Sequence, residues 1–302
     1  MRITNSMMIG QLMRNLNKNL ERMEKYQYQL ATGMRLARPS QDPVGITRSL
    51  QARTELSKLE KYKQNVSDAK AWLTQTETAL MEINSIITRC YELAVDAANG
   101  TKTKEDREAI SKEIAQLKEQ LIEAANTTYS DRYVFGGYYT TDKPFGKDGT
   151  YYGDNNRIKY ELAPENQMDV SITGKELMEI DDSNTLYSVL DELYKLLSLQ
   201  EDDSADQEQE KEQFDELIGN LQKGQEHILS LLAEVGGKTK RLELMEIRYD
   251  QDEINYKAIK SEVEDVDHEQ VIMEFLRAEM VYRSSLSVGA RIIQPTLVDF
   301  LR

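Results

Sequence analysis

The chain has 302 residues, of which 39% are apolar and 30% are charged, with only 15 Gly and 5 Pro. Few helix breakers among many Glu, Lys, Gln, Leu and Ala residues predict long helices and argue against a compact mixed fold. The net charge is −15, and the single cysteine excludes a thiolate metal cluster and a disulfide within the chain. No apolar run reaches the ~18 residues that predict a membrane span, so a membrane is not expected as a partner.

Charge is distributed unevenly along the chain. Residues 161–216 hold 18 Asp or Glu against 3 Lys or Arg, whereas residues 1–56 hold 9 Lys or Arg against 4 Asp or Glu. A basic N-terminal arm can indicate nucleic-acid binding. Here the basic residues alternate with apolar ones on a helix, and no aromatic-rich basic groove accompanies them. We therefore favour a solvated or subunit-facing helix side and expect no nucleic acid.

Both ends of the chain carry a narrow apolar stripe at helical spacing. The stripe in residues 1–36 consists of Ile9, Leu12, Met13, Leu16, Leu20, Met23, Leu30 and Met34. The stripe in residues 263–302 consists of Ile272, Phe275, Leu276, Tyr282, Leu286, Ala290 and Ile293, and the assembly residues expected there also include Leu297 and Leu301. Stripes this narrow are typical of a coiled coil, and the natural partner of each terminus is the other terminus.

The first helix should end at a hinge that contains Arg38, Pro39, Ser40, Asp42 and Pro43. Each proline biases the residue before it away from the helical region, and Asp42 before Pro43 suits the cap of a new helix. From Pro43 to Ala98 the spacing predicts one long helix with a continuous heptad seam. That seam consists of Leu59, Tyr62, Val66, Ala69, Leu73, Thr76, Leu80, Ile83, Ile87, Cys90, Ala94 and Ala97.

A second helical pair should complete an antiparallel rod. Thr103 and Asp106 have the spacing of a capping box, and the helix after them should fold back along its predecessor. Apolar residues at helical spacing from Phe214 to Val266 predict a partner of similar length. Between the two halves, residues 133–174 change to a period of two, which predicts a small β insertion with a hairpin turn at residues 163–166.

No catalytic or metal motif stands out in the sequence. His227 and His268 are interpreted as lying on separate stretches of one long helix, and Ile272 occupies the place where a second zinc-binding histidine would have to stand. Cys90 lies on the heptad seam and is interpreted as a small buried hydrophobe. We therefore expect no cofactor and no enzyme activity.

Several motifs carry a family resemblance. Residues 30–43, Leu-Ala-Thr-Gly-Met-Arg-Leu-Ala-Arg-Pro-Ser-Gln-Asp-Pro, resemble the N-terminal hinge of the bacterial flagellin family, in a form similar to its hook-associated branch. Residues 92–100, residues 133–138 with Lys143-Pro144-Phe145, residues 172–174 and the ending 285–302 are also similar to that branch. The resemblance covers both terminal thirds closely and the insertion more loosely.

The resemblance implies a mainly α, flagellin-like fold and a structural role in joining the flagellar hook to the filament. Residues 1–43 with 263–302 would form a terminal coiled-coil domain that is disordered in the free monomer. Residues 44–132 with 184–262 would form the rod, and residues 133–183 a small β-rich outer domain. Expected partners are further copies in a tubular ring, an adjacent hook-associated protein, flagellin, and an export chaperone for the C-terminal region. The location implied is extracellular, with export that uses no cleaved signal peptide.

The sequence leaves three alternative functions to consider. A filament flagellin would have the same ends, but the small insertion and the Arg38-Pro39-Ser40 form of the hinge disfavour it. A secreted enzyme with a catalytic insertion is disfavoured because residues 133–174 contain no His, no Cys and only Ser171 as a serine. A cytosolic coiled-coil scaffold is the third alternative.

Overall fold

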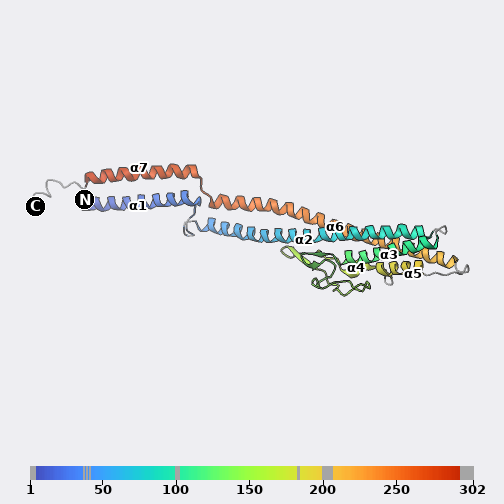
Figure 1. The fold of residues 1–302 in the computed structure, drawn as a ribbon. Helices are drawn as coiled ribbons and strands as arrows, with labels where there is room; N and C mark the ends of the chain where they lie inside the picture. Colours follow the sequence, from blue (N-terminus) through green and yellow to red (C-terminus); the bar gives the residue numbers. More distant parts are fainter. Residues whose placement is uncertain are drawn as a thin grey trace, which may run out of the picture. The chain divides into compact units, whose positions relative to one another are not determined.

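The computed structural model describes residues 5–36, 38, 40, 42–98, 103–181, 184–198 and 207–292. The described chain is mainly helical, which confirms the predicted fold class (Figure 1). Its helices are α1 (Asn5–Thr32), α2 (Pro43–Ala98), α3 (Lys104–Ala125), α4 (Gly174–Met178), α5 (Leu186–Ser198), α6 (Gln207–Glu264) and α7 (His268–Ile292). Its strands are β1 (Thr128–Tyr129), β2 (Arg132–Tyr133), β3 (Lys159–Ala163), β4 (Asn166–Asp169), β5 (Glu179–Asp181) and β6 (Asn184–Thr185).

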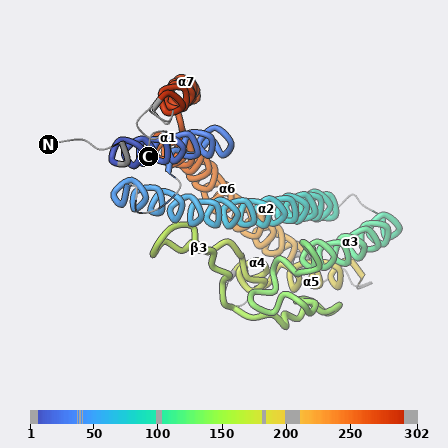
Figure 2. Tube along the Cα trace, turned by 90° about the vertical axis from the view of Figure 1, so that its left-hand side faces the viewer, coloured from blue at the N-terminus to red at the C-terminus, as the bar shows by residue number. Residues whose placement is uncertain are grey.

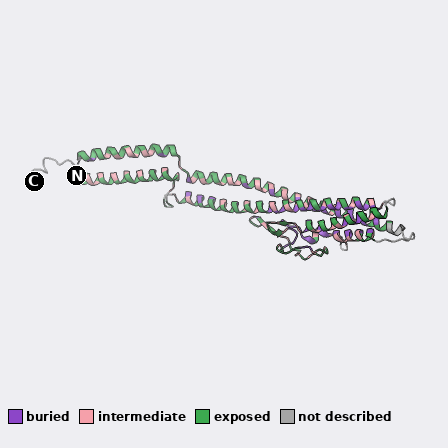
Figure 3. Ribbon diagram, in the orientation of Figure 1, coloured by how far each residue is buried: buried purple, intermediate pink, exposed green. Residues whose placement is uncertain are grey.

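The chain divides into two compact units. The terminal unit comprises residues 1–59 and 250–302, and the central unit comprises residues 60–249. Helices α2 and α6 contribute to both. Figure 3 shows that fully buried residues gather in the central unit, whereas α1 and α7 of the terminal unit are mostly exposed or half-buried. In the described chain, no helix is long and apolar enough to cross a membrane.

In the central unit, α2 and α6 pack side by side in opposite directions. Lys70 binds Glu246 at 3.0 Å, and Gln225 donates to Thr88 at 3.2 Å farther along the pair. The part of the predicted seam that lies in this unit is buried from Val66 to Ala97. The reason is the unbroken three-four spacing, which keeps one apolar line turned toward the partner over many turns.

The predicted capping box at the start of α3 is confirmed. The Thr103 hydroxyl accepts from the Asp106 amide, and the Asp106 carboxylate accepts from the Thr103 amide. Helix α3 then packs against α5, where Lys118 binds Asp191 at 2.6 Å. Lys118 also lies over the rings of Tyr187 and Tyr194, at 4.9 and 5.5 Å from their centroids.

Among the residues that the structure describes, the strands form three separate antiparallel pairs in and next to the β insertion, β1–β2, β3–β4 and β5–β6. The predicted hairpin is confirmed: β3 pairs with β4 through a turn in which Glu165 has a positive φ of 62°. The hairpin lies along α2, where the Asn65 amide donates to the Glu161 carbonyl at 2.7 Å (Figure 2). Leu162 and Met168 of the hairpin are buried. Because successive side chains of a strand point to opposite faces, the period of two in the sequence arises from one buried face of the hairpin.

Replacing Gly137 with alanine is expected to destabilise the insertion by at least about 2 kcal/mol. Gly137 has a φ of +66°, and a Cβ there would lie 2.0 Å from the Asp154 carbonyl oxygen. Because that neighbour is backbone, it cannot move aside as a flexible side chain would. Denaturant unfolding followed by tyrosine fluorescence measures the change. Gly219→Ala is the matched control, since a Cβ at Gly219 meets nothing within 4 Å. Equal stability of the two variants would contradict the expected strain.

The structure corrects the interpretation that both histidines lie on one long helix. Helix α6 ends at Glu264 and α7 begins at His268, where Asp267 accepts from the amides of Glu269 and Gln270. This aspartate caps a new helix, and capping favours a break over continuation. His227 remains on α6 in the central unit, and its Nε2 lies 2.6 Å from the Glu176 carbonyl oxygen. It therefore serves as a hydrogen-bond donor between α6 and α4.

Candidate assembly surface

Helices α1 and α7 lie side by side and run in opposite directions (Figure 1). At one end of the pair, a Cβ on Gly289 would lie 2.7 Å from Cδ2 of Leu12. At the other end, a Cβ on Gly33 would lie 3.9 Å from Nε2 of His268. Glycine at 289 therefore allows the two helices to approach closely beside Leu12.

The line of contact between α1 and α7 consists of half-buried or buried residues that are spaced three or four positions apart. We call this line the seam from here on, and it is distinct from the heptad seam of α2. On α1 the seam consists of Ile9, Leu12, Leu16, Asn19, Met23, Tyr26 and Leu30. On α7 it consists of Val271, Phe275, Ala278, Tyr282, Ser285 and Gly289. A pocket of about 150 Å³ that is open to solvent lies beside the seam, lined in part by Asn19, Tyr26 and Ala278. Most seam residues are half-buried, whereas the heptad positions of the central unit from Val66 to Ala97 are buried.

The assembly residues expected from the sequence fall into three groups. Ile9, Leu12, Leu16, Met23 and Leu30 of α1, with Phe275 and Tyr282 of α7, lie half-buried on the seam. Met13, Leu20, Ile272, Leu276 and Leu286 point outward and are exposed. Ile293, Leu297 and Leu301 lie outside the described residues.

The outward apolar residues form what we call the outer face. Met13, Leu20, Ile272 and Leu286 each directly follow a seam residue, and in an antiparallel pair these positions lie on the same flank. Leu276 continues the surface around α7 and is 54% exposed. Met273 and Met280, which the sequence analysis did not include, extend it further and are 62% and 68% exposed. The outer face thus comprises Met13, Leu20, Ile272, Met273, Leu276, Met280 and Leu286.

A backbone joint holds the inner end of the pair. Gly33 has a φ of +68° and turns the chain after α1. Its carbonyl accepts from the Val266 amide at 3.1 Å, and the Arg35 amide donates to the Glu264 carbonyl at 2.7 Å. Met34 and Asp265 form an antiparallel bridge between these two bonds. The segment after α1 is thereby held against the break between α6 and α7.

Side chains from α2 strengthen this joint. Arg53 donates to both Glu264 carboxylate oxygens, with each distance 2.7 Å, and the buried Ser49 hydroxyl also donates to Glu264. The hydrogen bond from Arg53 is the largest cause that lowers the pKa of Glu264 below its usual value. Arg35 adds two bonds to the Val263 carbonyl, at 3.1 and 2.9 Å. Two-point binding of a carboxylate by arginine fixes the geometry as well as adding energy.

Of the hinge residues expected from the sequence, Asp42 and Pro43 have clear structural roles. Pro43 is the first residue of α2, and the Asp42 carboxylate accepts from the Gly45 amide at 2.9 Å, as a capping residue does. Arg38 and Ser40 are exposed. Pro39 lies outside the described residues.

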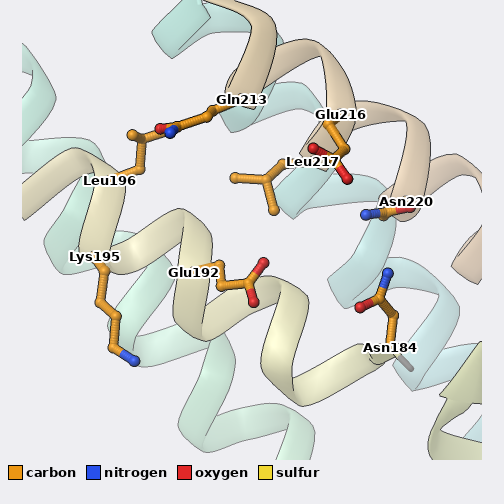
Figure 4. A pocket seen from close by; sticks show the side chains of 8 residues that line it. All are labelled: Asn184, Glu192, Lys195, Leu196, Gln213, Glu216, Leu217 and Asn220. Atoms are coloured by element: carbon orange, nitrogen blue, oxygen red, sulfur yellow. The ribbon is translucent and has the colours of Figure 1, made fainter. Parts of the chain in front are cut away.

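The central unit has a cleft of about 430 Å³ between α5 and α6 (Figure 4). Leu217 points toward α5, and the carboxylates of Glu192 and Glu216 come from facing helices. Within the described ranges, no three His, Cys, Asp or Glu side chains are grouped so that they could hold a metal ion. We therefore assign no site to this cleft.

Cys90 is expected to be unreactive in the folded chain. Burial, with a smaller contribution from Glu113, raises its pKa to about 12, so the reactive thiolate is nearly absent at neutral pH. Iodoacetamide should therefore leave the native chain unmodified and alkylate one thiol after denaturation in guanidinium chloride, as measured by intact mass. Alkylation of the native chain at the rate of the denatured chain would contradict its burial.

Comparison with known proteins shows which family and which folds this chain is similar to. Residues 3–140 match the family model described as the bacterial flagellin N-terminal helical region. The flagellar hook-associated protein 3 of Escherichia coli is 27% identical over 94% of this chain and 95% of its own length. A flagellin of Halalkalibacterium halodurans is 24% identical over 92% of this chain and 90% of its own length.

The fold is also similar to that of a solved structure. The flagellar junction protein FlgL of Legionella pneumophila superimposes with a TM-score of 0.62 and 14% identity, over 72% of this chain and all of that one. The resemblance to the flagellin family that the sequence indicates is thus confirmed. The chain is similar to the bacterial flagellin family through residues 3–140, and to flagellar hook-associated protein 3 over nearly its whole length.

Proposed function

We propose that this chain is a structural subunit that joins the hook of the bacterial flagellum to its filament. The observation that carries the proposal is the terminal pair, which combines a mostly half-buried seam with an exposed apolar outer face. Agreement with hook-associated protein 3 along nearly the whole length supports the same role. In this role the chain acts as a connector, and no catalytic step is required of it.

The physical basis of the role is incomplete burial in the single chain. Ordering one residue costs about 1–2 kcal/mol of backbone entropy, and an isolated helix pair with half-exposed apolar side chains offsets little of this cost. Burial of the outer face against neighbouring copies would supply the remainder. We propose that residues 1–43 and 263–302 form the assembling domain, that residues 44–132 with 184–262 form the rod, and that residues 133–183 project from it.

The proposed partners follow from this arrangement. Copies of the chain would form a ring through their terminal pairs, with a hook-associated protein on one side and flagellin on the other. An export chaperone would cover the C-terminal region before assembly, since that region carries exposed apolar residues. The subunit would act outside the cell after export without cleavage of a signal peptide.

Filament flagellin is the second candidate, because a flagellin also matches most of the chain. Sedimentation separates the two roles. The purified chain is mixed with sheared filament seeds, and separately with isolated hooks followed by flagellin, under conditions that polymerise flagellin. A junction subunit should remain in the supernatant with seeds alone, bind hook ends and allow flagellin to extend from them. Growth of long pelletable filaments from this chain alone would favour flagellin instead.

A further inference from the structure

Methionines are concentrated on the exposed surface of the terminal pair. Of the 12 methionines in the chain, Met13, Met273 and Met280 lie on the outer face. Met7 and Met8 at the start of α1, and Met34 just after its end, are also exposed. In contrast, Met168 and Met178 in the central unit are only 5% and 4% exposed. The thioethers therefore cluster at the surface through which assembly is proposed.

We propose that oxidation of the outer-face methionines to sulfoxides switches off assembly, so that hydrogen peroxide controls whether a free subunit can join the flagellum. This inference rests on the proposed function. The sulfur attacks the peroxide and gains one oxygen atom while losing two electrons, and the peroxide is reduced to water. No other reactant is needed. The product is a polar, chiral side chain in place of a flexible apolar one.

Position explains why these methionines should matter. Met273 and Met280 are seven residues apart on α7, so they lie on one side of the helix, with Leu276 between them. Met13 lies on the flank that also carries Ile272. A sulfoxide at any of these places brings a strong hydrogen-bond acceptor into an otherwise apolar surface, and burial of a polar group without a matching partner is unfavourable.

The same geometry predicts protection after assembly. Side chains of the central core are buried and those of the seam are half-buried, so oxidation of the exposed methionines should leave the helix content of the free chain unchanged. Once the outer face is covered by neighbours, its methionines should become as slow to react as Met168 and Met178. The switch would thus act on subunits before they are incorporated and would spare the finished structure.

The test uses the full chain, treated with hydrogen peroxide and then freed of it with catalase. Mass spectrometry of peptides gives the sulfoxide fraction at each methionine, and circular dichroism checks the helix content. Binding to isolated hooks is then measured for oxidised and untreated chain. We expect early oxidation of Met13, Met273 and Met280, unchanged helix content, and at least about a tenfold loss of hook binding.

A matched variant tests whether the loss of hook binding comes from the outer-face methionines. The triple replacement Met13→Leu, Met273→Leu and Met280→Leu keeps the apolar surface and should bind hooks before and after peroxide. Met81, which is exposed on α2 in the central unit, reports that the oxidant dose was the same. If the oxidised native chain binds as well as the untreated chain, or if the triple variant remains equally sensitive, the inference is wrong. If the untreated native chain fails to bind, the proposed function itself fails.

Discussion

Replacing Ile272 and Leu276 together with lysine should abolish hook joining while leaving the monomer folded. Both side chains are exposed on the outer face, so the free chain loses little by their removal. Lysine is a good helix former, and Glu269 and Glu279 lie three residues away from the new charges. In the assembly, however, the double variant loses apolar burial worth about 2 kcal/mol or more and must desolvate two charges.

That loss corresponds to at least a roughly 30-fold weaker attachment to hook ends. Attachment is measured by co-sedimentation with isolated hooks, and circular dichroism of the free chain checks folding. Met81→Lys is the matched control, because it places the same charge on an exposed methionine site in the central unit. If the double variant binds hooks as well as the native chain does, the outer face is not part of the interface with the hook.

The second large effect is expected at the joint of the terminal unit. Replacing Glu264 with alanine removes the acceptor of both Arg53 bonds and leaves the buried Ser49 hydroxyl without its partner. Loss of a partner for buried polar groups costs about 1–3 kcal/mol. Hydrogen exchange should then become about tenfold faster at the Arg35 and Val266 amides, which bond across the joint.

Glu246→Ala is the control for this measurement. It removes the ion pair with Lys70 in the central unit, where both partners are substantially exposed, and exposed pairs contribute little to stability. Its effect on exchange at Arg35 and Val266 should be absent. Equal exchange rates in the native chain and the Glu264 variant would show that the carboxylate does not hold the joint.

The same carboxylate gives a pH dependence with a defined sign. The hydrogen bond from Arg53 lowers the pKa of Glu264 in the folded state, so its stabilising effect is fully present above the pKa of the unfolded chain. The effect is lost as pH falls below that value and through the lower, folded pKa. The protection factors of the amides across the joint, which correct for the intrinsic pH dependence of exchange, should therefore fall on acidification in the native chain, and this fall should be smaller in Glu264→Ala.

Local signals in the sequence predicted much of the fold. The capping aspartate and the following proline set the start of α2, and the Thr103–Asp106 spacing set the start of α3. The unbroken heptad from Val66 to Ala97 predicted the buried side of α2, because a long helix has no other way to cover a continuous apolar line. The change to a period of two predicted the β3–β4 hairpin for the same reason.

The remaining features of the fold and of the assembly surface depend on tertiary contacts, and such contacts leave only weak signals in the local sequence. On α7 the seam includes Ala278, Ser285 and Gly289, and a search for large apolar residues passes over such positions although close helix approach favours them. The break between α6 and α7 is marked only by the capping role of Asp267. The bonds of Arg53 and Ser49 to Glu264 join residues more than 200 positions apart, with partners of ordinary type.

The central claim is that the outer face of the terminal pair becomes buried when the subunit joins the hook. Because Cys90 is buried, Leu276→Cys places a single reactive thiol on that face, and Tyr152→Cys places one on the insertion as a control. The rate of maleimide labelling is measured for the free chain and for chain attached to hooks. We expect attachment to suppress labelling at position 276 and to leave position 152 reactive. Labelling of position 276 at the same rate in both states would contradict the account.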